Sequence, residues 1–395
     1  MRKRTVRPLA LIAGAGLLLT GCATFDDTAA NQTYSSAPSI TPEHAPDPGG
    51  AGGRDAGPPK PGATSRTPIP PPQGCKDFDE AVIATCLDTV SAVAGIPSDG
   101  ASASALAGER KTGRILLVAN GKDPVVMATV GVDASGDGGL TGLALSPAYA
   151  EDQLFFAYIT TPSDNRVVRL AKGQAPKPVL TGIPKGATGN HGALMRDAKG
   201  GLLVATGDAG NPAAAADPNS LAGKILRIDV AGQPFAGNPT AGSAVFASGL
   251  HAPGGLCASD DGARLWVTDR QADKDVIYRV EAGKPFTSPA WSWPEKPGVY
   301  GCDDAGRALS VAATTAANMQ VLPLSPEGAV TSAPFASFDG KKVTGYGRLG
   351  PISPINADFA VLGTLNKEGG TPVSSDDRVV IINRKSGQSS MPGKD

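Results

Sequence analysis

Charged and aromatic side chains are both scarce in this chain of 395 residues. Aromatic residues make up 5% and charged residues 18%, and 36 Lys and Arg against 37 Asp and Glu leave a net charge of −1. Nucleic-acid binding requires a clustered positive excess that neutralises phosphates, so this balance argues against a nucleic-acid partner. Only three histidines occur, which restricts any histidine-rich metal site.

Long stretches free of glycine and proline are also missing. The chain contains 51 Gly and 35 Pro, and both residue types interrupt helices, so a helical bundle or coiled coil is excluded. Glycine shows no three-residue period, which excludes collagen. No G-x-S-x-G, P-loop or H-E-x-x-H motif occurs, so the chemistries that depend on them are not indicated.

The N-terminus carries the only long apolar run. Basic residues at positions 2–4 precede the apolar stretch Leu9 to Leu19, which is shorter than the roughly 20 residues that span a bilayer. Leu19-Thr-Gly-Cys22 follows and resembles the lipobox of bacterial lipoproteins. The resemblance predicts a signal peptide over residues 1–21 and a lipid on Cys22; the alternative is an ordinary secretory signal with a chance cysteine.

Residues 22–74 are predicted to be a lipidated, disordered tether. They are rich in proline and glycine and poor in large apolar side chains, so burial cannot offset the entropy of ordering them. Export and a lipid anchor together predict an extracytoplasmic protein held on the cell membrane at the cell envelope.

Four cysteines remain once Cys22 is set aside: Cys75, Cys86, Cys257 and Cys302. In an oxidising compartment they indicate two disulfides, for which three pairings are possible. We favour Cys75–Cys86 and Cys257–Cys302, because each pair is nearest in sequence. A metal site is a weaker interpretation because no C-x-x-C spacing occurs.

Residues 75–395 repeat one phrase six times: a polar turn with glycine, an apolar strand, a loop, and a second apolar strand. The paired strands are expected at 114–120 and 124–130, 153–159 and 166–170, 201–208 and 223–229, 263–269 and 275–280, 308–313 and 319–324, and 358–363 and 377–382. β-rich repeats of this length predict an all-β, six-bladed β-propeller. Two unrelated β domains are the alternative, and a short helix is expected within Asp77 to Ser91.

Three motifs resemble the glucose/sorbosone dehydrogenase family. They are Gly139-Leu-Thr-Gly-Leu-Ala-Leu-Ser-Pro-Ala-Tyr-Ala150, the stretch from Thr206-Gly-Asp-Ala-Gly-Asn-Pro212 to Asp229, and Ser248-Gly-Leu-His-Ala-Pro-Gly-Gly-Leu256 with Leu265-Trp-Val-Thr-Asp269. The resemblance spans about residues 95 to 383. It implies a six-bladed propeller that uses pyrroloquinoline quinone (PQQ) and calcium to oxidise an aldose sugar at its anomeric carbon.

By this resemblance His191 is the general base, and Asn190, His251, Asp269 and Arg348 are cofactor-binding residues. Imidazole suits the role because its pKa near 6.5 allows it to take a hydroxyl proton at neutral pH. The pattern departs from the family where His251-Ala-Pro-Gly-Gly255 replaces Arg-Asn-Pro-Gln-Gly, and where Gly350 replaces a second arginine. PQQ carries three carboxylates, so fewer cationic partners should weaken its binding.

Asp208, Asn211 and Asp217 are candidate calcium ligands because their side-chain oxygens suit a hard cation. Their spacing fits no EF-hand loop, and these residue types equally cap turns.

Two functions are therefore carried forward. The first is an exported, lipid-anchored sugar dehydrogenase that acts on a small-molecule sugar with PQQ and calcium as cofactors. The alternative is an inactive or re-purposed propeller that binds an envelope glycan or a protein partner. A third possibility, a metal between His191 and His251, rests only on their expected proximity.

Overall fold

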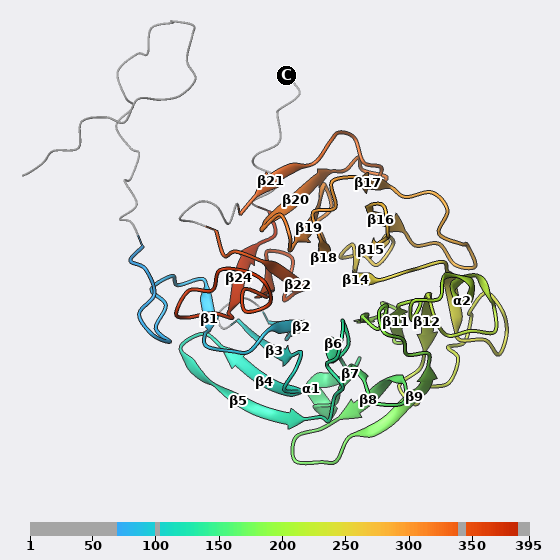
Figure 1. Cartoon of the computed structure of the whole chain (residues 1–395), viewed down its shortest axis with the longest axis horizontal. Helices are drawn as coiled ribbons and strands as arrows, with labels where there is room; N and C mark the ends of the chain where they lie inside the picture. Colours follow the sequence, from blue (N-terminus) through green and yellow to red (C-terminus); the bar gives the residue numbers. More distant parts are fainter. Residues whose placement is uncertain (1–68, 99–102, 339–344, 386–395) are drawn as a thin grey trace, which may run out of the picture. The chain divides into compact units, whose positions relative to one another are not determined.

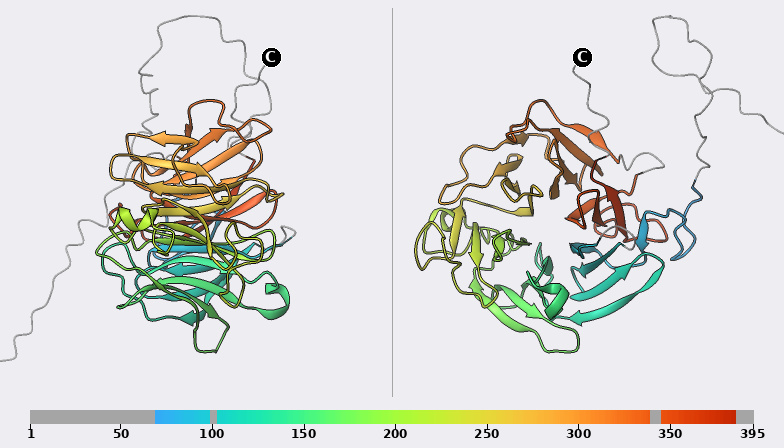
Figure 2. Two further views of the ribbon diagram at one scale, coloured as in Figure 1. Left: turned by 90° about the vertical axis from the view of Figure 1, so that its right-hand side faces the viewer. Right: turned by 180° about the vertical axis from the view of Figure 1, so that it is seen from behind.

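A computed structural model describes residues 69–98, 103–338 and 345–385. In these residues the chain forms six four-stranded antiparallel sheets arranged as blades around a central axis (Figure 1). The two views of Figure 2 show the blades stacked edge-on and the ring from behind. The predicted signal peptide, Cys22 and most of the predicted tether lie outside the described residues.

The first three blades follow one another along the chain. Blade 1 consists of β2 (Val90–Gly95), β3 (Ser104–Glu109), β4 (Arg114–Ala119) and β5 (Lys122–Thr129). Blade 2 consists of β6 (Leu140–Leu145), β7 (Phe155–Thr160), β8 (Asn165–Leu170) and β9 (Lys177–Ile183), with helix α1 (Tyr149–Asp152) between its first two strands. Blade 3 consists of β10 (Gly192–Arg196), β11 (Leu202–Thr206), β12 (Lys224–Ile228) and β13 (Val245–Ser248), with helix α2 (Pro212–Ala216) between β11 and β12.

The last three blades complete the ring. Blade 4 consists of β14 (Pro253–Ala258), β15 (Leu265–Arg270), β16 (Asp275–Arg279) and β17 (Trp291–Trp293). Blade 5 consists of β18 (Val299–Asp304), β19 (Ala308–Ala313), β20 (Asn318–Pro323) and β21 (Phe335–Ser337). Blade 6 consists of β22 (Leu349–Pro354), β23 (Phe359–Thr364), β24 (Val379–Asn383) and β1 (Val82–Ala84).

Blade 6 is built from both ends of the described chain. Its outermost strand is β1, which pairs antiparallel with β24 through Val82 opposite Val380. The expected helix within Asp77 to Ser91 is therefore wrong, because this segment supplies β1 and the first residues of β2. Its apolar residues serve as strand residues that close the ring.

The six-bladed propeller is confirmed. Ten of the twelve expected strands coincide with the second and third strands of blades 2 to 6, and the two expected at 114–120 and 124–130 coincide with the third and fourth strands of blade 1, β4 and the outermost strand β5. The innermost strand of each blade, which lies nearest the axis, was not part of the repeated phrase.

Each boundary between neighbouring blades holds one apolar cluster, so six such clusters form the core. At the boundary of blades 4 and 5, for example, Trp266 and Trp293 pack with Val299 and Leu322. The buried side chains are mostly Val, Leu, Ile and Ala. Packing aliphatic faces against each other explains why so few aromatic residues suffice.

Five of the six innermost strands carry an irregularity in their pairing close to where they begin. The pairing shifts between Val90 and Ala92 in β2, Leu140 and Gly142 in β6, Pro253 and Gly255 in β14, Val299 and Cys302 in β18, and Leu349 and Ile352 in β22. Such bulges release backbone groups from the ladder and re-aim side chains. All five bulges lie near the start of an innermost strand and so near the same end of the channel.

Both favoured disulfides are confirmed. Cys75–Cys86 has a Cα–Cα distance of 5.4 Å and fastens the segment before β1, and Cys257–Cys302 has one of 5.5 Å and joins β14 to β18. The first therefore reinforces ring closure and the second links two neighbouring blades.

Replacing Cys75 and Cys86 together by serine should lower the free energy of unfolding by about 3 kcal/mol, because a cross-link over 11 residues restricts the unfolded chain. Guanidinium unfolding, followed by tryptophan fluorescence, measures this change. The pair Cys257→Ser and Cys302→Ser, which opens a 45-residue loop, is the comparison and should cost about 4 kcal/mol. Unchanged stability of the first double variant would contradict the closing role of its disulfide.

Candidate functional site

A cavity of about 490 Å³ opens at the end of the channel where the innermost strands begin. Charged and polar side chains from several blades line it. They are Arg110, Asp137, His191, Arg270, Gln271, Asp275, Lys296, Tyr300, Thr314, Thr315, Arg348 and Glu368. Because these residues come from different blades, only the closed ring assembles them.

His191 directly precedes β10 and lies buried at this cavity. Its Nδ1 is 2.7 Å from the carbonyl oxygen of Pro253, and its Nε2 is 2.8 Å from the hydroxyl oxygen of Tyr300. A carbonyl can only accept, so in the neutral ring Nδ1 carries the proton and Nε2 presents a lone pair. His191 is thus held as a proton acceptor at Nε2.

Burial lowers the pKa of His191 to about 3, and the positive charge of Arg270 acts in the same direction. The nearby carboxylate of Asp137 and the Pro253 carbonyl favour the protonated ring and oppose this shift. Burial raises the pKa of Tyr300, so its hydroxyl keeps its proton at neutral pH. Both rings are consequently neutral in the resting site.

Two arginines at the cavity have unused hydrogen-bonding capacity. The Nε atoms of Arg270 and Arg348 are buried and have no hydrogen-bond partner among the residues that the structure describes. A buried donor without a partner costs free energy, so these guanidinium groups favour an anionic ligand. Gly350 could not supply the family's second arginine without rearrangement, because a Cβ there would lie 2.1 Å from Leu365.

The remaining cations are already engaged. Arg110 donates through Nε to Glu368 at 3.0 Å and through a terminal nitrogen to the Gly138 carbonyl at 2.6 Å. Lys296 donates to the Ala272 carbonyl at 2.9 Å. Among the described residues of the lining, Arg270 and Arg348 are thus the cations that carry a buried donor without a partner.

The two aspartates of the lining accept hydrogen bonds from backbone amides. Asp137 accepts from the amides of Gly189 and Asn190 at 2.9 and 3.1 Å, and Asp275 accepts from that of Gly298 at 2.6 Å. Asp137 thereby fixes the loop that carries His191. These carboxylates are positioned by the backbone and need no bound cation.

The predicted cofactor-binding residues separate into two groups. Arg348 lines the cavity, whereas Asn190 hydrogen-bonds to Gly186 and Asp137 and shapes the loop before β10. His251 and Asp269 lie outside the lining and contact each other, with 3.3 Å between Nδ1 and the carboxylate. That hydrogen bond raises the pKa of His251.

Two of the three candidate calcium ligands accept hydrogen bonds within their own turns. Asp208 accepts from the amide of Gly210 and Asp217 from that of Asn219, while Asn211 stands at the start of α2. Within residues 69–98, 103–338 and 345–385, no group of three His, Cys, Asp or Glu side chains could hold a metal. A metal between His191 and His251 is likewise without a ligand cluster there.

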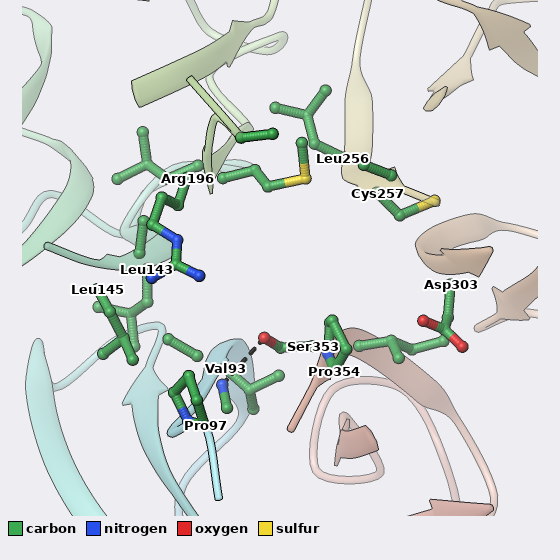
Figure 3. Close-up of a pocket in the computed structure, with 18 of the residues that line it drawn as sticks. Val93, Pro97, Leu143, Leu145, Arg196, Leu256, Cys257, Asp303, Ser353 and Pro354 are labelled. Atoms are coloured by element: carbon green, nitrogen blue, oxygen red, sulfur yellow. Dashed lines mark hydrogen bonds between the residues drawn. The ribbon is translucent and has the colours of Figure 1, made fainter. Parts of the chain in front are cut away.

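A second cavity of about 290 Å³ occupies the opposite mouth of the channel, at the ends of the innermost strands (Figure 3). Its labelled residues are mostly apolar, among them Leu143, Leu145 and Leu256. Asp303 is bound by the buried Arg384 at 2.9 Å. This mouth therefore offers no general base comparable to His191.

Sequence reasoning missed Arg110, Asp137, Arg270 and Tyr300. Arg270 directly follows Asp269 in the fourth blade motif, and Tyr300 stands two residues after Gly298 at the start of an innermost strand. A complete count of four strands per blade would have placed both at the channel.

The fold and site define a six-bladed β-propeller with a cationic cavity at one channel mouth. The chain belongs to the glucose/sorbosone dehydrogenase family, whose sequence pattern it matches over residues 93–345. No helix of the described residues is both long and apolar enough to cross a membrane.

Individual relatives agree with this assignment. The PQQ-bound aldose sugar dehydrogenase from Streptomyces coelicolor is 30% identical, with a TM-score of 0.69 over 79% of this chain and 99% of that chain. The soluble aldose sugar dehydrogenase from Escherichia coli, in its apo form, shares the fold at 20% identity and a TM-score of 0.63, over 77% of this chain and 99% of that chain. The aldose sugar dehydrogenase YliI of Escherichia coli (strain K12) is 27% identical over 179 residues, which are 40% of this chain and 48% of that protein. The chain thus matches about half the length of this curated relative.

The low pKa of His191 should make stability depend on pH. Because the folded value of about 3 lies below the ordinary 6.5, the unfolded chain binds more protons between these values, and stability falls as the pH falls below 6.5. From pH 6.5 to 5 this one group should cost about 2 kcal/mol. Unfolding of the protein and of His191→Gln at both pH values isolates the effect, since all other groups are shared. Parallel pH curves for the two proteins would contradict the buried, neutral state of His191.

Proposed function

We propose that this protein is an exported sugar dehydrogenase that oxidises an aldose, with PQQ as hydride acceptor and His191 as general base. The observation that carries the proposal is the cavity itself, where the neutral His191 lies beside Arg270 and Arg348, two arginines with unused donors. Family membership and the PQQ-bound relative support it.

The residues of the cavity fit a planar, polyanionic cofactor. Arg270 and Arg348 would hold carboxylates of PQQ through charge-assisted hydrogen bonds. The cavity, at about 490 Å³, falls in the range of roughly 300–1,000 Å³ that accommodates small molecules. The arginines lost relative to the family pattern are offset by Arg270, which reaches the cavity from the end of β15.

When bound, PQQ would supply the two-electron oxidant that takes a hydride from the anomeric carbon. The chain's own part is to remove the hydroxyl proton. His191 is suited to this because its Nε2 is unprotonated at neutral pH, while Pro253 holds Nδ1–H. The imidazolium that forms would be stabilised by Asp137 and by the Pro253 carbonyl.

Calcium has weaker support. The described residues hold no cluster of carboxylates and imidazoles for it, and the oxygens of Asp208 and Asp217 accept hydrogen bonds within their own turns. No step of the proposed function depends on calcium.

Removing either free arginine should weaken PQQ binding. Arg270→Gln and Arg348→Gln are each expected to raise the Kd of PQQ roughly tenfold or more, because each deletes a charge-assisted hydrogen bond. Calorimetric titration of the purified protein measures this. Arg307→Gln, on an exposed arginine outside the cavity lining, is the matched control and should not change the Kd.

Aldose-dependent dye reduction after loading with PQQ tests the activity. Absence of both PQQ binding and activity across a panel of aldoses would contradict the proposal and favour a propeller that binds a glycan or a protein partner.

The lipid anchor is proposed from the sequence Leu19-Thr-Gly-Cys22 and places the protein on the outer side of the cell membrane. We expect Cys22→Ser to abolish incorporation of a labelled fatty acid and to release the protein from the membrane fraction. Fractionation and labelling of the two forms in a bacterial host measure this. Incorporation that persists in Cys22→Ser would mean that the lipid is attached elsewhere or that an ordinary signal is used.

A further inference from the structure

The hydroxyl of Tyr300 has one proton but two acceptors. Its oxygen lies 2.8 Å from Nε2 of His191 and 2.9 Å from the carbonyl oxygen of Ser91. Three blades therefore meet at one hydroxyl group: Tyr300 belongs to β18, Ser91 to β2, and His191 precedes β10. At any moment the hydroxyl can donate to only one of these acceptors.

The Ser91 carbonyl is available because of the bulge in β2. Val90 pairs with Glu109 and Ala92 with Gly108, so Ser91 stands outside the regular ladder. Its carbonyl is released from strand pairing and accepts from the hydroxyl of Tyr300 across the channel. The second acceptor is thus built into the fold.

Tyr300 cannot easily leave this position. Its backbone carbonyl accepts a 2.5 Å hydrogen bond from the hydroxyl of Thr268, and its ring meets that of His191 edge-on, with 4.9 Å between centroids. The neighbouring blade is so close that a Cβ on Gly254 would lie 2.7 Å from the Cα of Tyr300. Tyr300 lines both the cavity of His191 and a small one of about 40 Å³ formed by residues of the innermost strands.

An imidazole nitrogen has a single lone pair, and at Nε2 of His191 the Tyr300 hydroxyl uses it. A substrate hydroxyl in the cavity cannot bond to Nε2 while this contact stands. We propose that Tyr300 is the proton relay between the cavity and His191, an inference that rests on the proposed function.

The transfer balances at every atom. The substrate O–H bond breaks and its proton forms a new O–H bond on Tyr300, while the original hydroxyl proton of Tyr300 forms an N–H bond at Nε2 of His191. Before the transfer Tyr300 donates to His191; afterwards His191 donates to Tyr300, and Tyr300 donates its new proton to the Ser91 carbonyl. The two observed acceptors therefore serve the Tyr300 hydroxyl before and after the transfer. The electron pair of the broken O–H bond stays on the substrate oxygen and forms the C=O bond, while the electron pair of the C–H bond leaves as hydride to the oxidant of the proposed function.

Burial and the surrounding charges set the resting protonation of the pair. The guanidinium of Arg270 lies 5.8 Å from the centre of the Tyr300 ring, and Arg110 also lines the cavity. Burial and both cations disfavour a resting imidazolium, whereas Asp137 favours one. Burial raises the pKa of Tyr300 although the two cations lower it, so Tyr300 keeps its proton and His191 stays unprotonated until a proton arrives.

Spectroscopy tests the relay without any activity. The chain has only three histidines, at positions 44, 191 and 251, so the protein labelled with ¹⁵N-histidine gives few signals, and His191→Gln and His251→Gln assign them. We expect His191 in the Nδ1–H form at pH 7, with its Nε2 resonance displaced by a hydrogen bond. Tyr300→Phe, which keeps the ring, should move that resonance to the position of a free lone pair; Tyr346→Phe, which loses a hydroxyl bonded to Asp79, should not.

Kinetics with PQQ and an aldose provide the second arm. Tyr300→Phe should lower kcat roughly 10- to 100-fold with KM changed less than about threefold, because proton transfer is impaired and binding is not. The solvent isotope effect should show two transferred protons in the wild type and one in the variant. Tyr346→Phe should match the wild type in all three measurements.

Different results separate the two proposals. An Nε2–H form of His191 in the wild type, or an Nε2 resonance unmoved in Tyr300→Phe, would overturn the relay whatever the activity. Unchanged kcat in an active Tyr300→Phe variant would also overturn it. If the wild type oxidises no aldose, the dehydrogenase proposal fails, and the relay contact then stands or falls on the spectra. Melting temperatures of all variants confirm that each one is folded.

Discussion

The antiparallel pairing of β1 with β24 closes the ring, and every other feature of the propeller depends on it. Without β1, blade 6 would expose the edge of β24, and the chain could not hold its first and last blades together. Several contacts reinforce this short strand. The Cys75–Cys86 disulfide fixes the preceding segment, and Asp77 is bound by Arg378 at 3.2 Å. Three residues of strand are thus stabilised by a cross-link and a buried charge pair.

Closure brings six innermost strands together around one axis, and their irregular starts create the site. A regular antiparallel ladder would use the carbonyls of alternate residues of these strands within their own blade. The bulges release some of them, and Ser91 then meets Tyr300 across the channel. The same closeness requires glycine where neighbouring blades touch; at Gly301, for instance, a Cβ would lie 2.4 Å from the amide nitrogen of Ile352. Glycine here serves packing as well as turns.

Most of the repeated apolar strands were predictable because they lie in the middle of a blade, where both faces are buried and aliphatic residues run together; the strand at 124–130, which became the exposed outermost strand β5, is the exception. The innermost strands escaped that pattern because their sequences contain glycine and proline, as in Pro253-Gly-Gly-Leu256 and Leu349-Gly-Pro-Ile352. His191 and Arg348 were found by resemblance to a family. Arg270 and Tyr300 were not, since nothing local distinguishes a residue that reaches the axis from one that packs between blades.

The sequence by itself determined the number of blades and the family. It also determined the cysteine pairing, which we favoured because the members of each pair are nearest in sequence. These properties depend on patterns within a few tens of residues. Only the tertiary structure decided that Tyr300 lies against His191, 109 residues away in the chain, and that Arg270 reaches the same cavity. The physical reason is that a propeller assembles its site from the starts of strands in different blades, so their contacts exist only after the ring closes.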